Sequence, residues 1–448
     1  MITWRLRGVT LLLLLPLVGC SILPLQQGDQ TQLGTPTPQA APTSSGSAAV
    51  ASEAVATPSA PGESTDVLQS GAASMVRIWV PPEFDPASNT PAGQLLKARL
   101  EQFTVENPDT RLEVRVKALD GEGGMLDSLV ASNAAAPLTL PDLVLLPRPL
   151  LESAALKGLI YPYDGLTSLM DDPSWFEYAQ QLARLESGIY GIPFAGDAMI
   201  LVNRPSLLGT RSYNLEDFLE LGEVLLFPAA DLQALYTLSQ YLVKDGSLQD
   251  AEGRPWLDEA ILTNTLEFYQ RASLAGVMPY WLTQYSNDEQ VWEAFMGGGF
   301  PMAITLASIY LKNTQNGAND LAMAPIPVLD DAPYTLASGC SWALAGQDPE
   351  KRVLSVQLAE FLVEPEFLAG WTSAAGYLPP RVDALQNWQN AGLKRAVEQI
   401  SYSAQLMPSM DVISTLGPAL EQAVVDVLKA QNDPQTAAQE VTDQVNQP

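Results

Sequence analysis

Histidine is absent from this chain of 448 residues, and cysteine occurs only twice, at positions 20 and 340. Without histidine the chain cannot build a Ser-His-Asp or Cys-His nucleophile or a histidine-based metal site. Paired carboxylates could still catalyse a reaction, but no such pair stands out in the sequence. We therefore predict no catalytic residue, no metal site and no cofactor. We also expect no disulfide framework, with Cys340 a small buried residue rather than a reactive thiol.

Basic side chains are scarce as well. Lys and Arg number 23 against 51 Asp and Glu, which gives a formal net charge of −28. Such a chain repels phosphate groups, which argues against DNA, RNA and anionic lipid surfaces as partners. The acidic excess is spread along the chain, so we interpret it as solvation of the surface.

Long apolar runs are missing, apart from one stretch at residues 9–18 that follows two arginines. It is too short to span a bilayer, which needs about 20 apolar residues, and it is typical of a secretory signal. The stretch ends in Leu-Val-Gly-Cys20, which resembles the bacterial lipobox, where the cysteine is lipidated and becomes the new N-terminus. We predict a lipoprotein signal peptide at 1–20, lipidation (palmitate) of Cys20, and attachment to the extracytoplasmic face of the cell membrane. An ordinary signal peptide with a chance cysteine is the alternative.

Residues 21–74 differ in composition from the rest of the chain. They consist largely of Pro, Ser, Thr, Ala and Gly and carry few large apolar side chains. Such a segment buries too little surface to offset its chain entropy, so we expect it to be disordered. A flexible chain of this length reaches about 40 Å. We interpret it as a tether, and a disordered N-terminus of no particular length is the alternative.

The remaining part, about 370 residues, is long enough for two domains of ordinary size. Apolar residues alternate at 75–80 and again at 112–118, with a helical pattern from about residue 91 between them, which predicts a βαβ unit. The continuous apolar run at 141–146 is expected of a strand covered on both faces. Residues 188–203 are expected to form two short strands joined by Ala-Gly-Asp197.

Helices predominate in the pattern from residue 200 to about 320. Residues 286–289 read as a capping box that opens a helix. Further helices are expected to begin at Pro349 and Pro365, because proline is favoured in the first helical turn. A late amphipathic helix covers about 417–428, and we expect the residues after it to be frayed.

This order of segments resembles the family 1 extracellular solute-binding proteins, the maltose-binding-protein-like group. The resemblance runs from about Met75 to about Lys429. The stretches that carry it are "LLKARLEQFTVENPDTRLEVRV", "PDLVLLPRPLLESAALKGLIYPYDGL", "GIYGIPFAGDAMILVNRPSL", "EAFMGGGFPMAI" and "KRVLSVQLAEFLVEPEFLAGWTSAAGYLPPRVDAL". Each stretch is degenerate alone, and their order and spacing make the assignment specific.

The resemblance implies an α/β fold of two discontinuous lobes joined by a hinge, of the type II periplasmic-binding-protein class. Lobe one would comprise 75–197 and 328–385, and lobe two 198–327 and 386–440. A small solute, a sugar or oligosaccharide, would bind in the cleft, and the lobes would close over it and deliver it to an ABC transporter permease. The resemblance implies a monomer and no enzymatic activity. The loop after the first strand departs from the tryptophan-and-glycine pattern common in sugar-binding members.

Candidate ligand-binding residues follow from their place in the implied fold, since aromatic faces stack on sugar rings and carboxylates or arginine bind hydroxyls. Asp197, in the hinge crossing, is the first candidate, and a turn cap is its structural alternative. Solvated loop charge, helix starts and core packing are the alternatives for the others. The full set is Glu83, Asp85, Arg148, Asp197, Trp281, Tyr285, Ser308, Tyr310, Trp371, Tyr377, Arg381 and Asp411.

Three other functions remain open at this point. The ligand could be a polyol phosphate, a polyamine or a peptide. The chain could be the solute-binding sensor subunit of a membrane receptor, in which case a kinase gene rather than a permease gene would neighbour it. A surface glycosidase would need two closely placed carboxylates in a cleft and would turn over a chromogenic glycoside.

We predict that the substitution Cys20→Ala releases the protein from the membrane, because the acyl chains on this cysteine would be the anchor. Immunoblots of membrane and soluble fractions measure the change. Cys340→Ala is the matched control and should leave the protein in the membrane fraction. An unchanged membrane fraction for Cys20→Ala would count against the lipobox.

Overall fold

The computed structural model describes residues 74–186, 188–209, 214–315, 317, 320–330 and 332–446. The predicted signal peptide, its Cys20 and all but the last residue of the predicted tether lie outside these ranges. Within the part of the chain described, no helix has the length and apolar character needed to cross a membrane.

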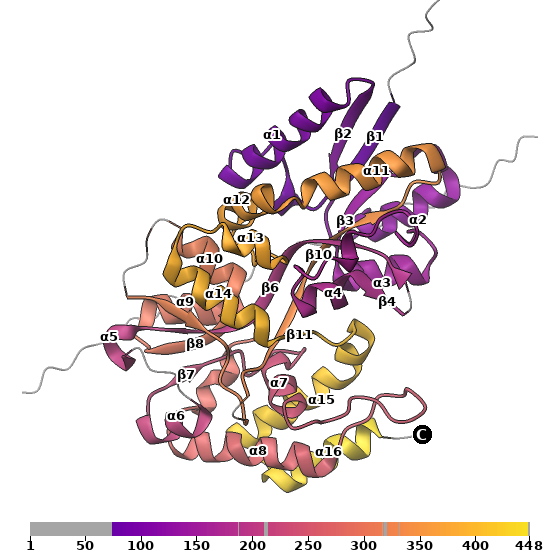
Figure 1. The fold of residues 1–448 in the computed structure, drawn as a ribbon. Helices are drawn as coiled ribbons and strands as arrows, with labels where there is room; N and C mark the ends of the chain where they lie inside the picture. Colours follow the sequence, from indigo (N-terminus) through magenta and orange to yellow (C-terminus); the bar gives the residue numbers. More distant parts are fainter. Residues whose placement is uncertain are drawn as a thin grey trace, which may run out of the picture. The chain divides into compact units, whose positions relative to one another are not determined.

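A parallel βαβ unit opens the fold, as the sequence predicts (Figure 1). Strand β1 (Ser74–Val80) pairs in parallel with β2 (Thr110–Val116) on one side and with β3 (Leu143–Pro147) on the other. Helix α1 (Pro91–Glu106) connects β1 to β2. It starts where Thr90 accepts a hydrogen bond from the Gly93 N–H at 3.0 Å, with proline at the first helical position.

Side chains of β1 alternate between two buried clusters. Val76, Ile78 and Val80 pack in the same cluster as Leu96 of α1, on one face of the sheet. Trp79 points to the other face, where α2 (Met125–Ala135) and α3 (Arg148–Leu156) cover it. Both faces of this part of the sheet are therefore covered by helices, which explains the continuous apolar run of β3.

The strand β6 (Ile192–Asn203) is one continuous strand, so the prediction of two short strands joined by Ala-Gly-Asp197 is wrong. Residues 195–198 stay extended because they pair antiparallel with residues 337–340 of β10 (Thr335–Leu344). That partner lies far along the sequence, so local pattern did not reveal it. Strand β10 also pairs with β3, which joins β6 to the βαβ unit.

The second half of β6 belongs to another group of strands. Residues 199–203 pair antiparallel with β8 (Met302–Leu306), and 201–203 pair with β9 (Ala322–Ala324). Strand β7 (Leu225–Leu226) continues this group beside β8. The strand order is β2-β1-β3-β10-β6-β8-β7, with β11 (Ala404–Leu406) paired to β10. One strand thus runs through two sheet regions.

Helices surround both regions. The short hairpin β4 (Arg184–Leu185) and β5 (Gly188–Ile189) stands apart from the main sheet. The helices between β3 and β10 are α3, α4 (Glu177–Ala183), α5 (Pro205–Leu208), α6 (Leu215–Leu221), α7 (Leu235–Leu242), α8 (Glu259–Leu274), α9 (Asp288–Gly298) and α10 (Ala307–Thr314). After β10 come α11 (Pro349–Leu362), α12 (Pro365–Ala375), α13 (Val382–Gln386), α14 (Ala391–Ser403), α15 (Met410–Leu428) and α16 (Pro434–Val445).

Two predictions about helices differ from the structure: the cap of one helix and the order of the last segment. Helix α9 is capped by Asn287, which accepts from the Gln290 N–H at 3.0 Å, so the cap lies one residue later than predicted. The predicted frayed end is wrong, because α16 is a regular helix. Asp433 caps it by accepting from the Thr436 N–H at 3.1 Å, and its apolar side, including Ala438, packs against α8 and α15.

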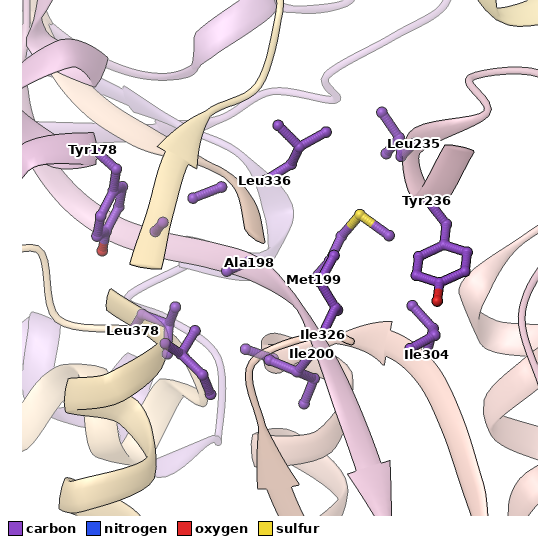
Figure 2. Packing of buried hydrophobic residues seen from close by; sticks show 14 of the residues in the cluster. Tyr178, Ala198, Met199, Ile200, Leu235, Tyr236, Ile304, Ile326, Leu336 and Leu378 are labelled. Atoms are coloured by element: carbon purple, nitrogen blue, oxygen red, sulfur yellow. The ribbon is translucent and has the colours of Figure 1, made fainter. Parts of the chain in front are cut away.

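The core runs without interruption past the crossing strand. Figure 2 shows Met199 of β6 extending toward Leu235 and Tyr236 of the second region, with Tyr178 and Leu378 of the first region on the other side. All five residues belong to one buried cluster. The crossing is therefore packed on both sides along its length.

Close approach of β6 and β10 depends on two paired glycines, Gly196 and Gly339. A Cβ added at Gly339 would lie 2.3 Å from the carbonyl oxygen of Ala195, and one added at Gly196 would lie 2.1 Å from Tyr178 Oη. Because the first of these contacts is with backbone, a side chain at Gly339 would force the strands apart.

We predict that Gly339→Ala lowers the free energy of unfolding by about 1–3 kcal/mol, the usual cost of overpacking. Urea unfolding followed by circular dichroism measures it. Gly370→Ala is the control, because an added Cβ there, in α12, meets no atom within 4 Å and alanine favours a helix over glycine by about 1 kcal/mol. Equal stability changes for the two variants would contradict the packing argument.

Candidate functional site

Asp197 lies where β6 passes from one sheet region to the other, and its carboxylate is fixed on α10. Oδ1 accepts from the N–H groups of Ser308 and Ala198, both at 2.9 Å, and Oδ2 accepts from the Ser308 hydroxyl. Ser308 is in the first turn of α10, so the carboxylate meets the positive end of that helix. Burial raises the pKa of Asp197, and the hydrogen bonds from Ser308 oppose the shift.

Cys340 shares a sheet face with Asp197. It pairs with Ala195, two residues before Asp197, and side chains two apart on a strand point to the same face. Burial raises the pKa of the Cys340 thiol to about 12, and the charges of Glu83 and Asp197 add to the shift. Cys340 is nevertheless partly exposed, so the prediction that it is a buried residue is wrong, although the raised pKa keeps the thiolate fraction low at neutral pH.

Lys312 approaches the same place from α10. It lies one helical turn after Ser308, on the same side of the helix. Its ammonium donates to Tyr377 Oη at 3.0 Å and lies 4.1 Å from the centre of the Tyr377 ring. Burial lowers the pKa of Lys312, and the carboxylates of Asp197 and Glu83 oppose that shift.

The site therefore brings together four predicted residues, Glu83, Asp197, Ser308 and Tyr377, from four separate segments of the chain. Sequence reasoning missed Lys312. The spacing Ser308 to Lys312 was the available signal, because residues four apart share a helix face.

The ring of Tyr377 is covered on its faces. It stacks with Phe84 at 5.5 Å and with Trp371 at 6.2 Å between ring centres, and Lys312 lies over it. Trp371 is fully buried and also contacts Phe194. Neither ring offers a free face on which a sugar could stack, and Trp371 is packed within the core.

Both predicted ligand-binding arginines are engaged within the fold. Arg148 pairs with Glu152 at 2.7 Å and donates to the carbonyls at the end of α4, including that of Gln181 at 2.7 Å. Arg381 is buried and pairs with Asp383 at 2.7 Å and Asp172 at 3.0 Å. These contacts tie distant segments together and leave little of either guanidinium for a solute.

Tyr310 also lies in the core, edge-on to Trp292, and its hydroxyl donates to the Leu321 carbonyl at 3.3 Å. Trp281 and Tyr285 are part-exposed and meet edge to face, with ring centres 6.4 Å apart. These two rings keep surface that a solute could contact, whereas Tyr310 does not.

The two remaining predicted acids lie elsewhere. Asp85 accepts from the Ala87 N–H at 2.8 Å and so stabilises its own turn. Asp411 is exposed in the first turn of α15, beside a surface pocket of about 310 Å³ that Tyr190 and Ser409 also line. The structure does not bring Asp411 into contact with the Asp197 group.

Two further acids stand at helix starts near Asp197 and were missed. Asp231 accepts from the Leu235 N–H at 3.3 Å at the start of α7. Asp288 opens α9, and its Oδ1 is buried without a hydrogen-bond partner among the described residues. Burial raises the pKa of Asp288 to about 7, with Asp231, Asp197 and Glu289 adding to the shift.

The side chains of this site are engaged in hydrogen bonds. Among the described residues no group of three or more His, Cys, Asp and Glu could hold a metal ion. Carboxylates such as those of Asp197 and Glu83 can accept charge-assisted hydrogen bonds, which are stronger than neutral ones.

Comparison with known proteins identifies relatives. The sequence model of the family described as bacterial extracellular solute-binding protein matches residues 98–397. A lactose-binding protein of Rhizobium radiobacter is 26% identical over 312 residues, which cover 62% of this chain and 68% of that protein.

Solved structures confirm the predicted fold class. The sugar-binding protein MalE of Xanthomonas citri superposes with a TM-score of 0.70 at 19% identity, covering 83% of this chain and 96% of that one. The maltose-bound MalE of Listeria monocytogenes gives 0.66 at 16% identity, covering 83% and 97%. The likeness covers 83% of this chain and nearly the whole of both solved chains, so the type II periplasmic-binding-protein fold is shared.

We predict that Asp288 makes the protein more stable in acid than at neutral pH. Its folded-state pKa of about 7 exceeds the value of about 3.9 for an unfolded aspartate. The stability contributed by the protonated carboxyl is therefore complete below pH ~4 and is lost as the pH rises through about 7.

The variant Asp288→Asn should remove this loss. Its free energy of unfolding should exceed that of the parent by roughly 1–3 kcal/mol at pH 8 and differ little at pH 4. Urea melts at the two pH values measure it, and Glu293→Gln, at an exposed position of the same helix, is the control. The same pH dependence in the parent and in Asp288→Asn would show that Asp288 is not the titrating group.

Proposed function

Because the chain belongs to the family of bacterial extracellular solute-binding proteins, we propose that it captures a sugar or oligosaccharide and delivers it to an ABC transporter permease. The family match over residues 98–397 carries this proposal. The named ligands of the relatives, lactose and maltose, support a sugar as the solute. Under this proposal the chain is a binding protein and not an enzyme.

We propose the lobe division 75–197 with 328–385 and 198–327 with 386–440. The passage of β6 from one group of strands to another, at residues 198–199, supports it. The chain returns from lobe two to lobe one between residues 327 and 328. Beside this boundary, the side chains of Tyr236 and Gln240 donate to the Pro327 carbonyl at 3.3 and 3.0 Å. A hinge needs few covalent crossings, each with a defined backbone path.

Solute binding is assigned to the surface around Asp197. Its carboxylate is preorganised by Ser308 and Ala198, so binding a solute hydroxyl costs no side-chain entropy. Glu83, from the loop after β1, is the second acceptor. Trp281 and Tyr285 keep exposed aromatic surface on the side of lobe two, which suits the apolar face of a sugar ring.

Anchoring by lipidated Cys20 would keep the folded part at the outer face of the membrane as a monomer. A sugar-capture protein must stay near its permease, and an anchor raises its local concentration there. The anchor and the permease are both part of this proposal.

We predict that Asp197→Asn weakens sugar binding by roughly 10- to 100-fold, because a hydrogen bond to a charged group contributes about 1.5–3 kcal/mol. A thermal-shift screen with lactose, maltose and maltotriose first finds the sugar, since a ligand of the folded state raises the melting temperature. Isothermal titration then compares the variants.

The control is Asp433→Asn. Asp433 accepts from the N–H and hydroxyl of Thr436 at the start of α16, the same kind of cap that Asp197 forms with Ser308. It should leave sugar affinity unchanged. Equal affinities for the two variants would remove Asp197 from the site, and a screen without any shift would remove sugars as the solute class.

A further inference from the structure

Helix α10 carries contacts that cross the proposed lobe boundary. The helix belongs to lobe two, but its last turn rests on the segment that follows α12 in lobe one (Figure 1). The Lys312 ammonium donates to Tyr377 Oη at 3.0 Å. The Gln315 side-chain amide donates to the Ala374 carbonyl at 2.8 Å.

Backbone geometry of the turn permits this approach. Gly376 ends α12 with a left-handed φ of 72°, a conformation that favours glycine. A Cβ at this position would lie 2.6 Å from Lys312 Cγ and 2.9 Å from the backbone nitrogen of Lys312. The turn and the helix therefore touch through backbone, which requires a residue without a side chain.

The same turn is attached to the crossing strand. Leu378 and Gly196 exchange two backbone hydrogen bonds, each of 2.8 Å. Tyr377 is held between them and Gly376, with its ring stacked on Phe84 and Trp371. The turn is thus rigidly part of lobe one, and it presents a fixed surface to α10.

Two sets of contacts hold α10. Its first turn is bound by Asp197, at the lobe boundary itself. Its last turn is bound by Tyr377 and Ala374, within lobe one. Rotation of lobe two away from lobe one can keep the first set, because it lies on the crossing strand, but it must break the second set.

We propose that Lys312 and Gln315 form a latch with the turn Ala374–Tyr377, which stabilises the closed arrangement of the two lobes and so sets the affinity for solute. These two are positioning residues, since they act through the lobe arrangement and need no contact with the solute. The latch rests on the proposed lobe division. Breaking it lowers the fraction of binding-competent molecules, and apparent affinity falls by the same factor.

The test measures a distance between the lobes in the absence of solute. Spin labels are placed by Val105→Cys on α1 and Leu274→Cys on α8, two positions with 79% and 85% of their surface exposed. The full chain is used in a Cys20→Ala background. Cys340 is partly exposed, so it is also replaced, by Cys340→Ala, and the two introduced cysteines carry the labels.

The variants remove the latch without removing its packing. Lys312→Met keeps the aliphatic stem and Gln315→Ala removes the amide, and we combine them. Lys97→Met, at an exposed ion pair with Glu101, is the control, and Lys312→Arg tests rescue by another cation. Double electron–electron resonance gives the distance distribution of each protein.

We expect the parent, the Lys97→Met control and the Lys312→Arg variant to share one distance distribution that includes a short distance. The combined Lys312→Met and Gln315→Ala variant should populate a longer distance, with the separated fraction raised roughly fivefold or more. A distribution identical to that of the parent would overturn the latch, whatever happens to the melting temperature.

A wedge variant separates this failure from failure of the proposed function. In Gly376→Ala the new Cβ pushes directly on Lys312. If this wedge lengthens the distance while the combined variant does not, the lobes are hinged and only the latch is wrong. If neither variant changes the distance, and a sugar that raises the melting temperature also leaves it unchanged, the two regions do not move as lobes, and the proposed capture mechanism fails together with the latch.

Discussion

Strand β6 is paired on its first half with β10 and on its second half with β8 and β9, and the arrangement of the whole site depends on this shared strand. The strand runs through both sheet regions, so it connects them directly. It also places Asp197 at the point where the pairing partner changes. The carboxylate at that point accepts hydrogen bonds from the first turn of α10, the helix that follows β8. The last turn of the same helix donates a hydrogen bond to Tyr377, in the turn after α12.

Carboxylates occupy three helix starts around the proposed site. The positive ends of α7, α9 and α10 would attract anions, but each already carries an aspartate, at 231, 288 and 197 respectively. Two of these carboxylates are satisfied by backbone N–H groups, and Asp288 keeps a buried oxygen without a partner among the described residues. Lys312 interacts electrostatically with Asp197 and donates a hydrogen bond to Tyr377.

Sequence reasoning found the features that are encoded locally. The alternation of β1, the apolar run of β3 and the proline starts of α11 and α12 depend on neighbouring residues, and the structure confirms them. It failed where a distant partner decides the outcome. The continuity of β6 depends on β10, and α16 is ordered by packing on α8 and α15, although its residues are mostly polar.

The candidate site also contains residues that sequence reasoning placed well and residues whose partners it could not foresee. Asp197 and Ser308 were predicted from their place in a resembling family, and the structure joins them by hydrogen bonds. Arg148 and Arg381 were predicted in the same way, but their partners, such as Asp172 for Arg381, lie too far along the chain to be inferred from spacing. Lys312 was missed because a helical pattern does not say which neighbour a charged face will meet.

Hydrogen exchange resolved to single amides, with and without a sugar that raises the melting temperature, tests the central claim most directly. The account predicts that the sugar slows exchange at Ala198 and Ser308, the two amides that the Asp197 carboxylate binds, more than at the remote cap amide of Thr436. Slowing that is confined to segments away from β6 and α10 would contradict it, because the solute would then bind elsewhere.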